Sequence, residues 1–265
     1  FGFTKPKTPV PGMDVAGVVE AIGPEVADFM VGDAVFGTCH GSFAEYAVAR
    51  GDRIAPKPDN LTFEQAAGVP ISAYTALHGL RDAGKVRAEQ SVLVIGAAGG
   101  VGHFAVQLAK LFGAAVTGVC STAKIDMVRS LGADHVIDYT AGDITQGAER
   151  YDLILDIAGR RPLADLRRIL AREGTLVIIG GEGGDKWFGG THRQIGAMLL
   201  SPFIEQNLKT FISMENRDDL LLLSEYIEAG RLAPVIDRSY PLAEAAEAIR
   251  HIEAGHACGK TVITV

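Results

Sequence analysis

Gly96-Ala97-Ala98-Gly99-Gly100-Val101-Gly102 lies between a short apolar run, Val92–Ile95, and a run of helical periodicity that begins at Val101. Small residues at such a turn let the backbone bend sharply and approach a phosphate group closely. Free N–H groups and the positive end of the following helix favour the charge of that phosphate. The strict G-x-G-x-x-G spacing fails because Ala97 stands where its first glycine would be. The order of strand, loop and helix still favours a dinucleotide-binding loop over a purely structural turn.

Short β-rich runs alternate with helical patterns beyond about Ser91, which is typical of right-handed crossovers and a parallel sheet. The expected strands are Val92–Ile95, Ala115–Val119, Val136–Asp138, Leu153–Asp156, Leu176–Ile179 and Leu208–Ile212. The first helix is expected to bury one face, made of Val101, Phe104, Ala105, Leu108 and Phe112. The glycine-rich stretch from Gly180 to Gly190 has two interpretations, a solvated loop or a mobile cover over a cofactor cleft.

The first part of the chain, to about Lys57, consists of short apolar segments separated by Gly-Pro and Gly-Asp turns, which predicts hairpins or a barrel. The strands expected there are Val15–Ile22, Ala34–Phe36 and Phe43–Val48. Thr62 and Gln65 then have the spacing of a capping box ahead of a helix. Thr261–Val265 is expected to be a last strand that returns to this first domain. Because the pattern is already under way at Phe1, we expect part of the first domain, or a removed targeting segment, upstream.

The composition excludes two classes of partner. A net charge of −7 with scattered basic residues gives no footprint for nucleic acid. No apolar run reaches the roughly 18 residues of a membrane-spanning helix. Three dispersed cysteines, Cys39, Cys120 and Cys258, are too few for a disulfide framework, so we expect a reducing, cytoplasmic setting.

The residues at the end of the second strand of the parallel sheet indicate which dinucleotide would bind. An NAD site normally carries Asp or Glu there to bind the ribose hydroxyls. Here the position is Cys120, followed by Ser121, Thr122 and Lys124, which could donate hydrogen bonds and positive charge. This sequence favours NADPH over NADH. The alternative is that Ser121 caps the next helix and Lys124 is an ordinary surface lysine.

Five motifs together resemble a known family. In chain order they are Gly12-Met13-Asp14-Val15-Ala16-Gly17-Val18-Val19, Gly32-Asp33-Ala34-Val35-Phe36-Gly37, Gly41-Ser42-Phe43-Ala44-Glu45-Tyr46, Ala73-Tyr74-Thr75-Ala76 and the glycine loop. They resemble the zinc-independent quinone oxidoreductase branch of the medium-chain dehydrogenase/reductase superfamily. The resemblance implies an α/β fold with a GroES-like β-barrel domain, residues 1–75 and 232–265, and a doubly wound Rossmann domain, residues 76–231. It also implies an active site in the cleft between the domains and a homodimer.

The resemblance further implies a set of cofactor contacts in this chain. Thr75 would lie near the nicotinamide-side phosphate, and Ser121, Lys124 and Tyr139 around the 2′-phosphate. Ala158, Gly159 and Gly180 would border the ribose and nicotinamide, and Gly259 and Lys260 are weaker candidates. In the glycine loop the implied contacts are Ala98, Gly99, Gly100, Val101 and Gly102. A half-buried tyrosine with no phosphate role is an equal alternative for Tyr139.

The sequence departs from the zinc-dependent relatives. Met13-Asp14 stands where they carry His-Glu, and the four-cysteine cluster of a structural zinc is missing. A zinc ion that polarises a substrate needs three protein ligands, and Cys39 with His40 does not supply that set. We therefore expect no metal.

Without a metal, the plausible chemistry is hydride transfer from NADPH to an acceptor that is already electrophilic, such as a quinone or an alkene conjugated to a carbonyl. Tyr46 and Tyr74 are candidate donors to the developing oxyanion, although a core role explains each better. No catalytic acid is assigned. Three hypotheses remain: an NADPH-dependent quinone oxidoreductase, an enal or enoyl-thioester reductase, and a non-catalytic NADPH-binding protein.

Overall fold

The computed structural model describes residues 10–159, 161–179, 196–197, 204–255 and 257–265. The chain divides into two compact units, Phe1–Tyr74 with Met214–Val265 and Thr75–Ser213. We expected the second domain to extend to residue 231. Helix α7 (Arg217–Glu228) instead lies in the first unit, where it packs against β3 (Ile54–Pro56). The functional boundaries of the two domains stay a prediction.

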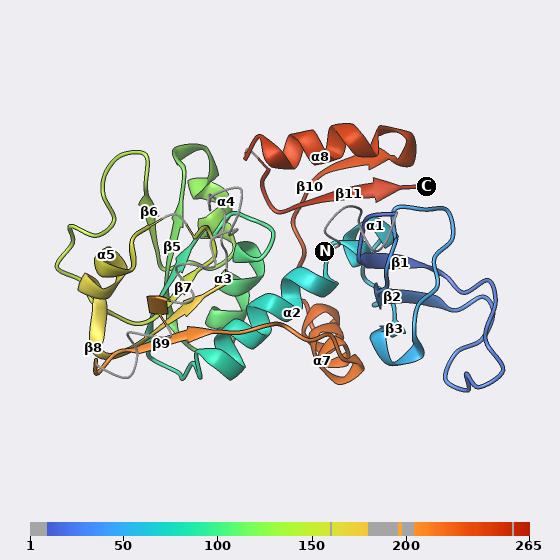
Figure 1. The fold of residues 1–265 in the computed structure, drawn as a ribbon, viewed down its shortest axis with the longest axis horizontal. Coiled ribbons are helices and arrows are strands. Elements are labelled where there is room, and N and C mark those ends of the chain that lie inside the picture. The colour runs from blue at the N-terminus through green and yellow to red at the C-terminus, as the bar shows by residue number, and fades with distance from the viewer. Residues whose placement is uncertain (1–9, 160, 180–195, 198–203, 256) are drawn as a thin grey trace. The chain divides into compact units, whose positions relative to one another are not determined.

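The second unit is built on a parallel sheet of six strands in the order β6-β5-β4-β7-β8-β9 (Figure 1). The strands are β4 (Ser91–Ile95), β5 (Ala115–Cys120), β6 (His135–Asp138), β7 (Tyr151–Asp156), β8 (Leu170–Ile178) and β9 (Asn207–Thr210). All six lie where the sequence predicted a strand, although β8 begins six residues before the predicted Leu176. The central strands are buried apolar runs because a parallel sheet is covered on both faces. The sheet reverses its direction of growth between β4 and β7, the point at which such folds bind ligands.

The connecting helices of this unit are short. They are α3 (Gly102–Leu111), α4 (Ile125–Ser130) and α5 (Leu163–Arg168), with single turns η2 (Gly79–Ala83) and η3 (Thr122–Lys124). In α3, Phe104, Ala105 and Leu108 are fully buried as predicted, whereas Val101 and Phe112 are only partly buried. Burial extends beyond one face, to His103, Val106 and Ala109. The helix that follows the glycine loop is therefore held firmly in the second unit.

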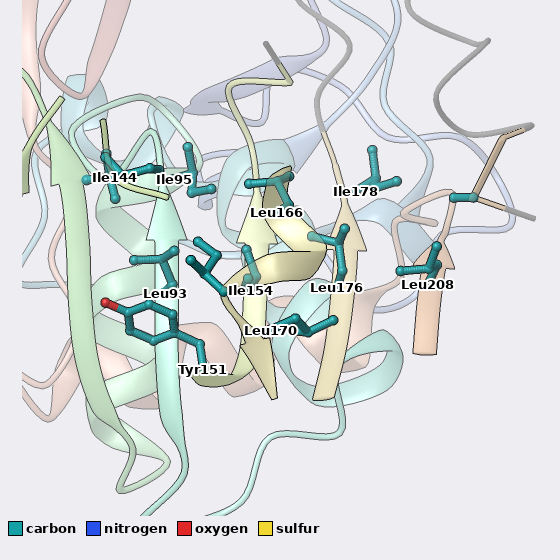
Figure 2. Close-up of a cluster of buried hydrophobic side chains, with 13 residues drawn as sticks. Leu93, Ile95, Ile144, Tyr151, Ile154, Leu166, Leu170, Leu176, Ile178 and Leu208 are labelled. Carbon is teal, nitrogen blue, oxygen red and sulfur yellow. The ribbon is translucent and has the colours of Figure 1, made fainter. Parts of the chain in front are cut away.

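One cluster of apolar side chains fills a face of the six-stranded sheet (Figure 2). Leu93, Ile154, Leu176 and Leu208 come from β4, β7, β8 and β9, and Leu166 of α5 joins the same cluster. All five side chains are at most 5% exposed. Together they fix the strand ends from which the candidate site is built.

The first unit contains two small sheets. Strands β1 (Asp14–Val18), β2 (Ala34–Thr38) and β3 are antiparallel, and β10 (Ile236–Pro241) pairs in parallel with β11 (Lys260–Thr264). The other elements are α1 (Phe63–Ala67), α2 (Pro70–His78), which runs across the boundary of the two units, α8 (Ala245–Glu253), and single turns at η1 (Gly51–Arg53) and η5 (Leu242–Glu244). The predicted capping box is confirmed, since Thr62 and Gln65 exchange two hydrogen bonds of 3.0 and 3.2 Å. The last strand lies in the same unit as the N-terminal strands, as expected.

Two strand predictions in this unit need correction. The segment 43–48 forms bends rather than a strand. Its first amides bond locally, Phe43 N–H to the Pro11 carbonyl and Ala44 N–H to the Ser42 carbonyl, so the alternating pattern has no ladder to enter. Strand β1 ends at Val18 instead of continuing to Ile22, because the chain turns away after Val19 N–H bonds to the Asp33 carbonyl.

Candidate dinucleotide-binding site

The glycine loop leaves β4 through a sharp turn at Gly96. Gly96 has φ +89°, a left-handed conformation that costs glycine nothing. The amides of Gly96 and Ala97 both donate to the Val119 carbonyl of β5, at 3.2 and 3.0 Å. Gly99 N–H donates back to the Gly96 carbonyl at 3.0 Å. The loop is therefore rigidly tied to the two neighbouring strands.

Gly102 is the second fixed point of this loop. A Cβ atom at this position would lie 2.0 Å from the Gly96 carbonyl oxygen, so no larger residue fits. Helix α3 begins there, and Val101 gives it no side-chain cap. No side chain therefore caps the start of this helix, where the His103 N–H is bonded to the Gly99 carbonyl at 3.1 Å. The close approach of Gly102 to Gly96 shows that this tight loop forms with Ala97 at the position of the first glycine of the strict G-x-G-x-x-G pattern.

The end of β7 meets the same loop. A Cβ atom on Gly96 would lie 3.4 Å from the amide nitrogen of Ala158. The fully buried carboxylate of Asp156 accepts a hydrogen bond from Gly159 N–H at 3.1 Å. Ala158 and Gly159 thus lie beside the glycine loop at the switch point between β4 and β7. The sequence analysis gave Asp156 no role, although an aspartate that ends a buried strand just before an Ala-Gly turn was a readable signal.

The ends of β5 and β6 bring together Ser121, Lys124 and Tyr139. Tyr139 N–H donates to the Cys120 carbonyl at 3.1 Å, and Lys124 N–H donates to the Ser121 carbonyl at 2.9 Å. The Tyr139 side chain is 52% exposed, and its contact with the 2′-phosphate stays a prediction. Cys120 itself is buried.

Asp138 at this edge was missed by the sequence analysis. Its Oδ2 accepts from Thr122 Oγ1 at 2.5 Å, and its Oδ1 accepts from Thr140 N–H at 2.8 Å. The hydrogen bond from Thr122, followed by those from Thr140, holds the pKa of this carboxyl below its usual value. Asp138 is the last residue of a predicted strand, but its position beside Cys120 comes from the parallel pairing of β6 with β5, which the sequence does not show.

The remaining cofactor candidates belong to other parts of the chain. Thr75 is half-buried on α2, and Gly180 is outside the described residues. Gly259 and Lys260 lie in the first unit at β11. There the Lys260 ammonium contacts Asp14 Oδ2 at 3.2 Å and donates to Ser72 Oγ at 2.8 Å. All these cofactor contacts stay predictions.

The two tyrosines considered as oxyanion donors differ in environment. Tyr74 is fully buried and its hydroxyl donates to the Asn216 carbonyl at 2.7 Å. Burial, followed by the negative charge of Asp219, raises the pKa of Tyr74, so its hydroxyl stays protonated. Tyr46 is 75% exposed. The described structure therefore supports a packing role for Tyr74, as the sequence favoured, but not for Tyr46.

Comparison with known proteins identifies the family to which this architecture belongs. A model of the alcohol dehydrogenase GroES-like domain matches residues 2–59, and a zinc-binding dehydrogenase model matches residues 131–263. The chain belongs to the medium-chain dehydrogenase/reductase superfamily. Its fold is close to that of the quinone oxidoreductase of Coxiella burnetii, with a TM-score of 0.82 and 29% identity over 98% of this chain and 80% of that chain. The predicted Rossmann and GroES-like architecture is confirmed.

Two plant relatives are similar over 97% of this chain. They are the 2-methylene-furan-3-one reductase of Solanum lycopersicum, 35% identical, and the chloroplastic NADPH-dependent alkenal/one oxidoreductase of Arabidopsis thaliana, 36% identical. The chain spans 64% of the length of each of these relatives.

The family name of the second match raises the question of zinc. Within the described part of the chain, no group of three His, Cys, Asp or Glu side chains could hold a metal ion. Cys39 is buried while the adjacent His40 is exposed. The described residues therefore do not fit a zinc site, and we derive no chemistry through one. The described helices also include none with the length and apolar character needed to cross a membrane.

Proposed function

We propose that this protein is a zinc-independent oxidoreductase that binds NADPH and reduces a quinone or a related conjugated carbonyl compound. The observation that carries the proposal is the close approach of Gly102 to the Gly96 carbonyl, which leaves no room for a Cβ atom. It creates a backbone cradle at the start of α3, at the switch point of the parallel sheet. Such a cradle suits a pyrophosphate because backbone N–H groups and a helix N-terminus both favour negative charge.

In this proposal the residues of the second unit bind and orient the cofactor. The loop from Ala98 to Gly102 would hold the pyrophosphate, Ser121 and Lys124 the 2′-phosphate, and Ala158 with Gly159 the ribose and nicotinamide. When bound, NADPH supplies a hydride. The chain's own contribution is positioning, exclusion of water and a polar contact to the oxygen that gains charge. An acceptor that is already electrophilic needs no metal to activate it.

The preference for NADPH is part of the proposal. It is supported by the lack of a carboxylate at Cys120 and by the name of the Arabidopsis relative, which specifies NADPH as that protein's cofactor. The homodimer, the reducing cytoplasmic setting and a small-molecule acceptor are proposals of the same kind. Light scattering of the full chain during gel filtration tests the dimer, with a mass of twice 28.0 kDa as the expected result.

A second candidate is reduction of an alkene conjugated to a carbonyl. It is favoured by the names of the two plant relatives, which act on a methylene-furanone and on alkenals or enones. This reaction needs the same cofactor site, so only the acceptor distinguishes the two candidates. A third possibility is an NADPH-binding protein with no catalytic activity.

Steady-state oxidation of NADPH by the full chain tests these candidates. A panel of quinones and a panel of 2-alkenals and enones are compared at equal concentrations, with an acceptor-free control. We expect turnover with quinones at a higher kcat/KM than with the alkenes. The reverse order would favour the reductase of conjugated alkenes. Saturable NADPH binding with no turnover on either panel would overturn the proposed activity in favour of the non-catalytic role.

A further inference from the structure

Asp138 places a carboxylate at the edge of the sheet where the second phosphate of NADPH is proposed to bind. It is the last residue of β6, and its Cα is paired with that of Cys120, the last residue of β5. Thr122 Oγ1 donates to Oδ2 at 2.5 Å, while Thr140 donates to Oδ1 from both its amide and its hydroxyl, at 2.8 and 2.6 Å. The carboxylate therefore links the ends of two adjacent strands.

The donors to this carboxylate are neutral. Each threonine hydroxyl has a single proton, and both hydroxyl oxygens lie within hydrogen-bonding distance of the Asp138 carboxylate and of each other. The two hydroxyl oxygens lie 2.9 Å apart, as expected for two groups that share one acceptor. Hydroxyls and an amide stabilise a negative charge without neutralising it. The Thr122 hydroxyl is also occupied, so it is not available to donate to a phosphate.

The residues proposed for the 2′-phosphate are close in the chain to Asp138 or to its partner Thr122. Tyr139 follows Asp138 directly, and Thr122 lies between Ser121 and Lys124 in the chain. The backbone bonds from Tyr139 to Cys120 and from Lys124 to Ser121 keep the two strand ends together. A phosphate bound by Ser121, Lys124 and Tyr139 would therefore have the Asp138 carboxylate as a close neighbour of the same sign.

We propose that Asp138 determines how strongly the protein discriminates between NADPH and NADH, by opposing the 2′-phosphate that Ser121 and Lys124 attract. This proposal rests on the proposed function, because it concerns the same site. Like charges at short range disfavour one ligand without changing the other, which is a common basis of specificity. The wild-type protein should thus accept both cofactors, with a smaller preference for NADPH than a serine and a lysine alone would give. Asparagine at position 138 keeps the shape and most of the hydrogen bonds but removes the charge.

Binding of two cofactor fragments to the full chain tests this inference without any catalysis. Adenosine 2′,5′-bisphosphate and adenosine 5′-monophosphate differ only in the 2′-phosphate, and calorimetry gives a Kd for each. We expect Asp138→Asn to increase the affinity for the bisphosphate about fivefold to tenfold at low salt, and to leave the monophosphate unchanged. The gain should shrink at high ionic strength because the repulsion is screened.

Asp134→Asn is the matched control. Asp134 lies immediately before β6 and contacts Lys110 and the Val116 amide, about 13 Å along the strand from Asp138. The Asp134→Asn substitution removes a charge of the same sign from the other end of β6. The ratio of bisphosphate affinity to monophosphate affinity should therefore stay at the wild-type value. Thr122→Val keeps the carboxylate charged, so its ratio should equal or fall below that of wild type.

Three results would overturn the inference. An unchanged ratio in Asp138→Asn would leave Asp138 only a structural link between β5 and β6. An equal rise in Asp134→Asn would mean a general effect of net charge, and an equal rise in Thr122→Val would mean that the hydrogen bond matters rather than the charge. The proposed function fails in a different way, in that the wild-type protein would bind neither fragment.

Discussion

Asp14 and Asp138 are carboxylates at the ends of strands, but their surroundings are opposite. Asp14, 19% exposed, starts β1, is paired with Lys260 of β11 and accepts the Ile71 N–H of α2 at 2.8 Å. It joins segments up to 246 residues apart. Asp138 ends β6 and receives only hydroxyl and amide donors from nearby residues. At Asp14 a cation thus neutralises the charge that holds distant segments together, whereas the described donors to Asp138, where a ligand is expected, are neutral.

The largest effect is expected from a side chain in the glycine cradle. Gly102→Ala would place a methyl group 2.0 Å from the Gly96 carbonyl, so the loop must shift. We expect the affinity for NADPH to fall about a hundredfold, and the free energy of unfolding to fall by about 1–3 kcal/mol. Fluorescence titration and urea denaturation measure the two effects.

Gly142→Ala is the control for this variant, because a Cβ there meets no atom within 4 Å and its backbone is not left-handed. It should bind NADPH and unfold as the wild-type protein does. Wild-type affinity in Gly102→Ala would show that the cradle is not the binding site.

Loss of the ion pair between Asp14 and Lys260 should lower the stability of the protein. Lys260→Met leaves a largely buried carboxylate without its cation, and we expect the free energy of unfolding to fall by about 1–3 kcal/mol, since both side chains keep some contact with water. Asp14→Asn should cost a similar amount, and the double variant less than the sum of the two. Urea denaturation of the wild-type protein, the two single variants and the double variant completes the double-mutant cycle. If the losses of stability in the two single variants added up in the double variant, Asp14 and Lys260 would not interact directly. A large loss of NADPH affinity in Lys260→Met would instead support the predicted contact of Lys260 with the cofactor.

A smaller change is expected from the capping box of α1. Thr62→Ala removes the oxygen that accepts the Gln65 N–H, which should lower the free energy of unfolding by about 1 kcal/mol. Thr62→Ser retains that oxygen and should unfold close to wild type. NADPH affinity should be unchanged in both, because no cofactor contact is predicted on α1. Equal losses of stability in the two variants would show that the methyl group, rather than the cap, matters.

The smallest expected effect is on the reactivity of Cys39, whose thiol is influenced by the negative charge of Asp14. Burial, followed by the carboxylate of Asp14, raises the pKa of the Cys39 thiol. A raised pKa means that the thiolate forms only at higher pH, so iodoacetamide should modify Cys39 more slowly than the less buried Cys258 at pH 8. Mass spectrometry of peptides from timed samples gives both rates. Modification of Cys39 as fast as that of Cys258 would contradict its burial and its raised pKa.

The sequence predicted the six-stranded sheet well because its signals are local. The apolar runs of β4 and β7, and the glycines beside them, are each readable within a few residues. It was wrong at 43–48, where an alternating pattern met no partner strand, since the Phe43 and Ala44 amides bond within nearby turns. Asp138 was missed for a similar reason. Its importance comes from the lateral pairing of β6 with β5, which depends on topology rather than on spacing along the chain.

Hydrogen–deuterium exchange of the full chain with and without NADPH tests the central claim most directly. If the carboxyl edge of the parallel sheet holds the cofactor, the amides of residues 96–102 should exchange more slowly in the complex, together with those of residues 121–124 and 138–140. Saturable binding with no change at residues 96–102, or no saturable binding at all, would contradict the account.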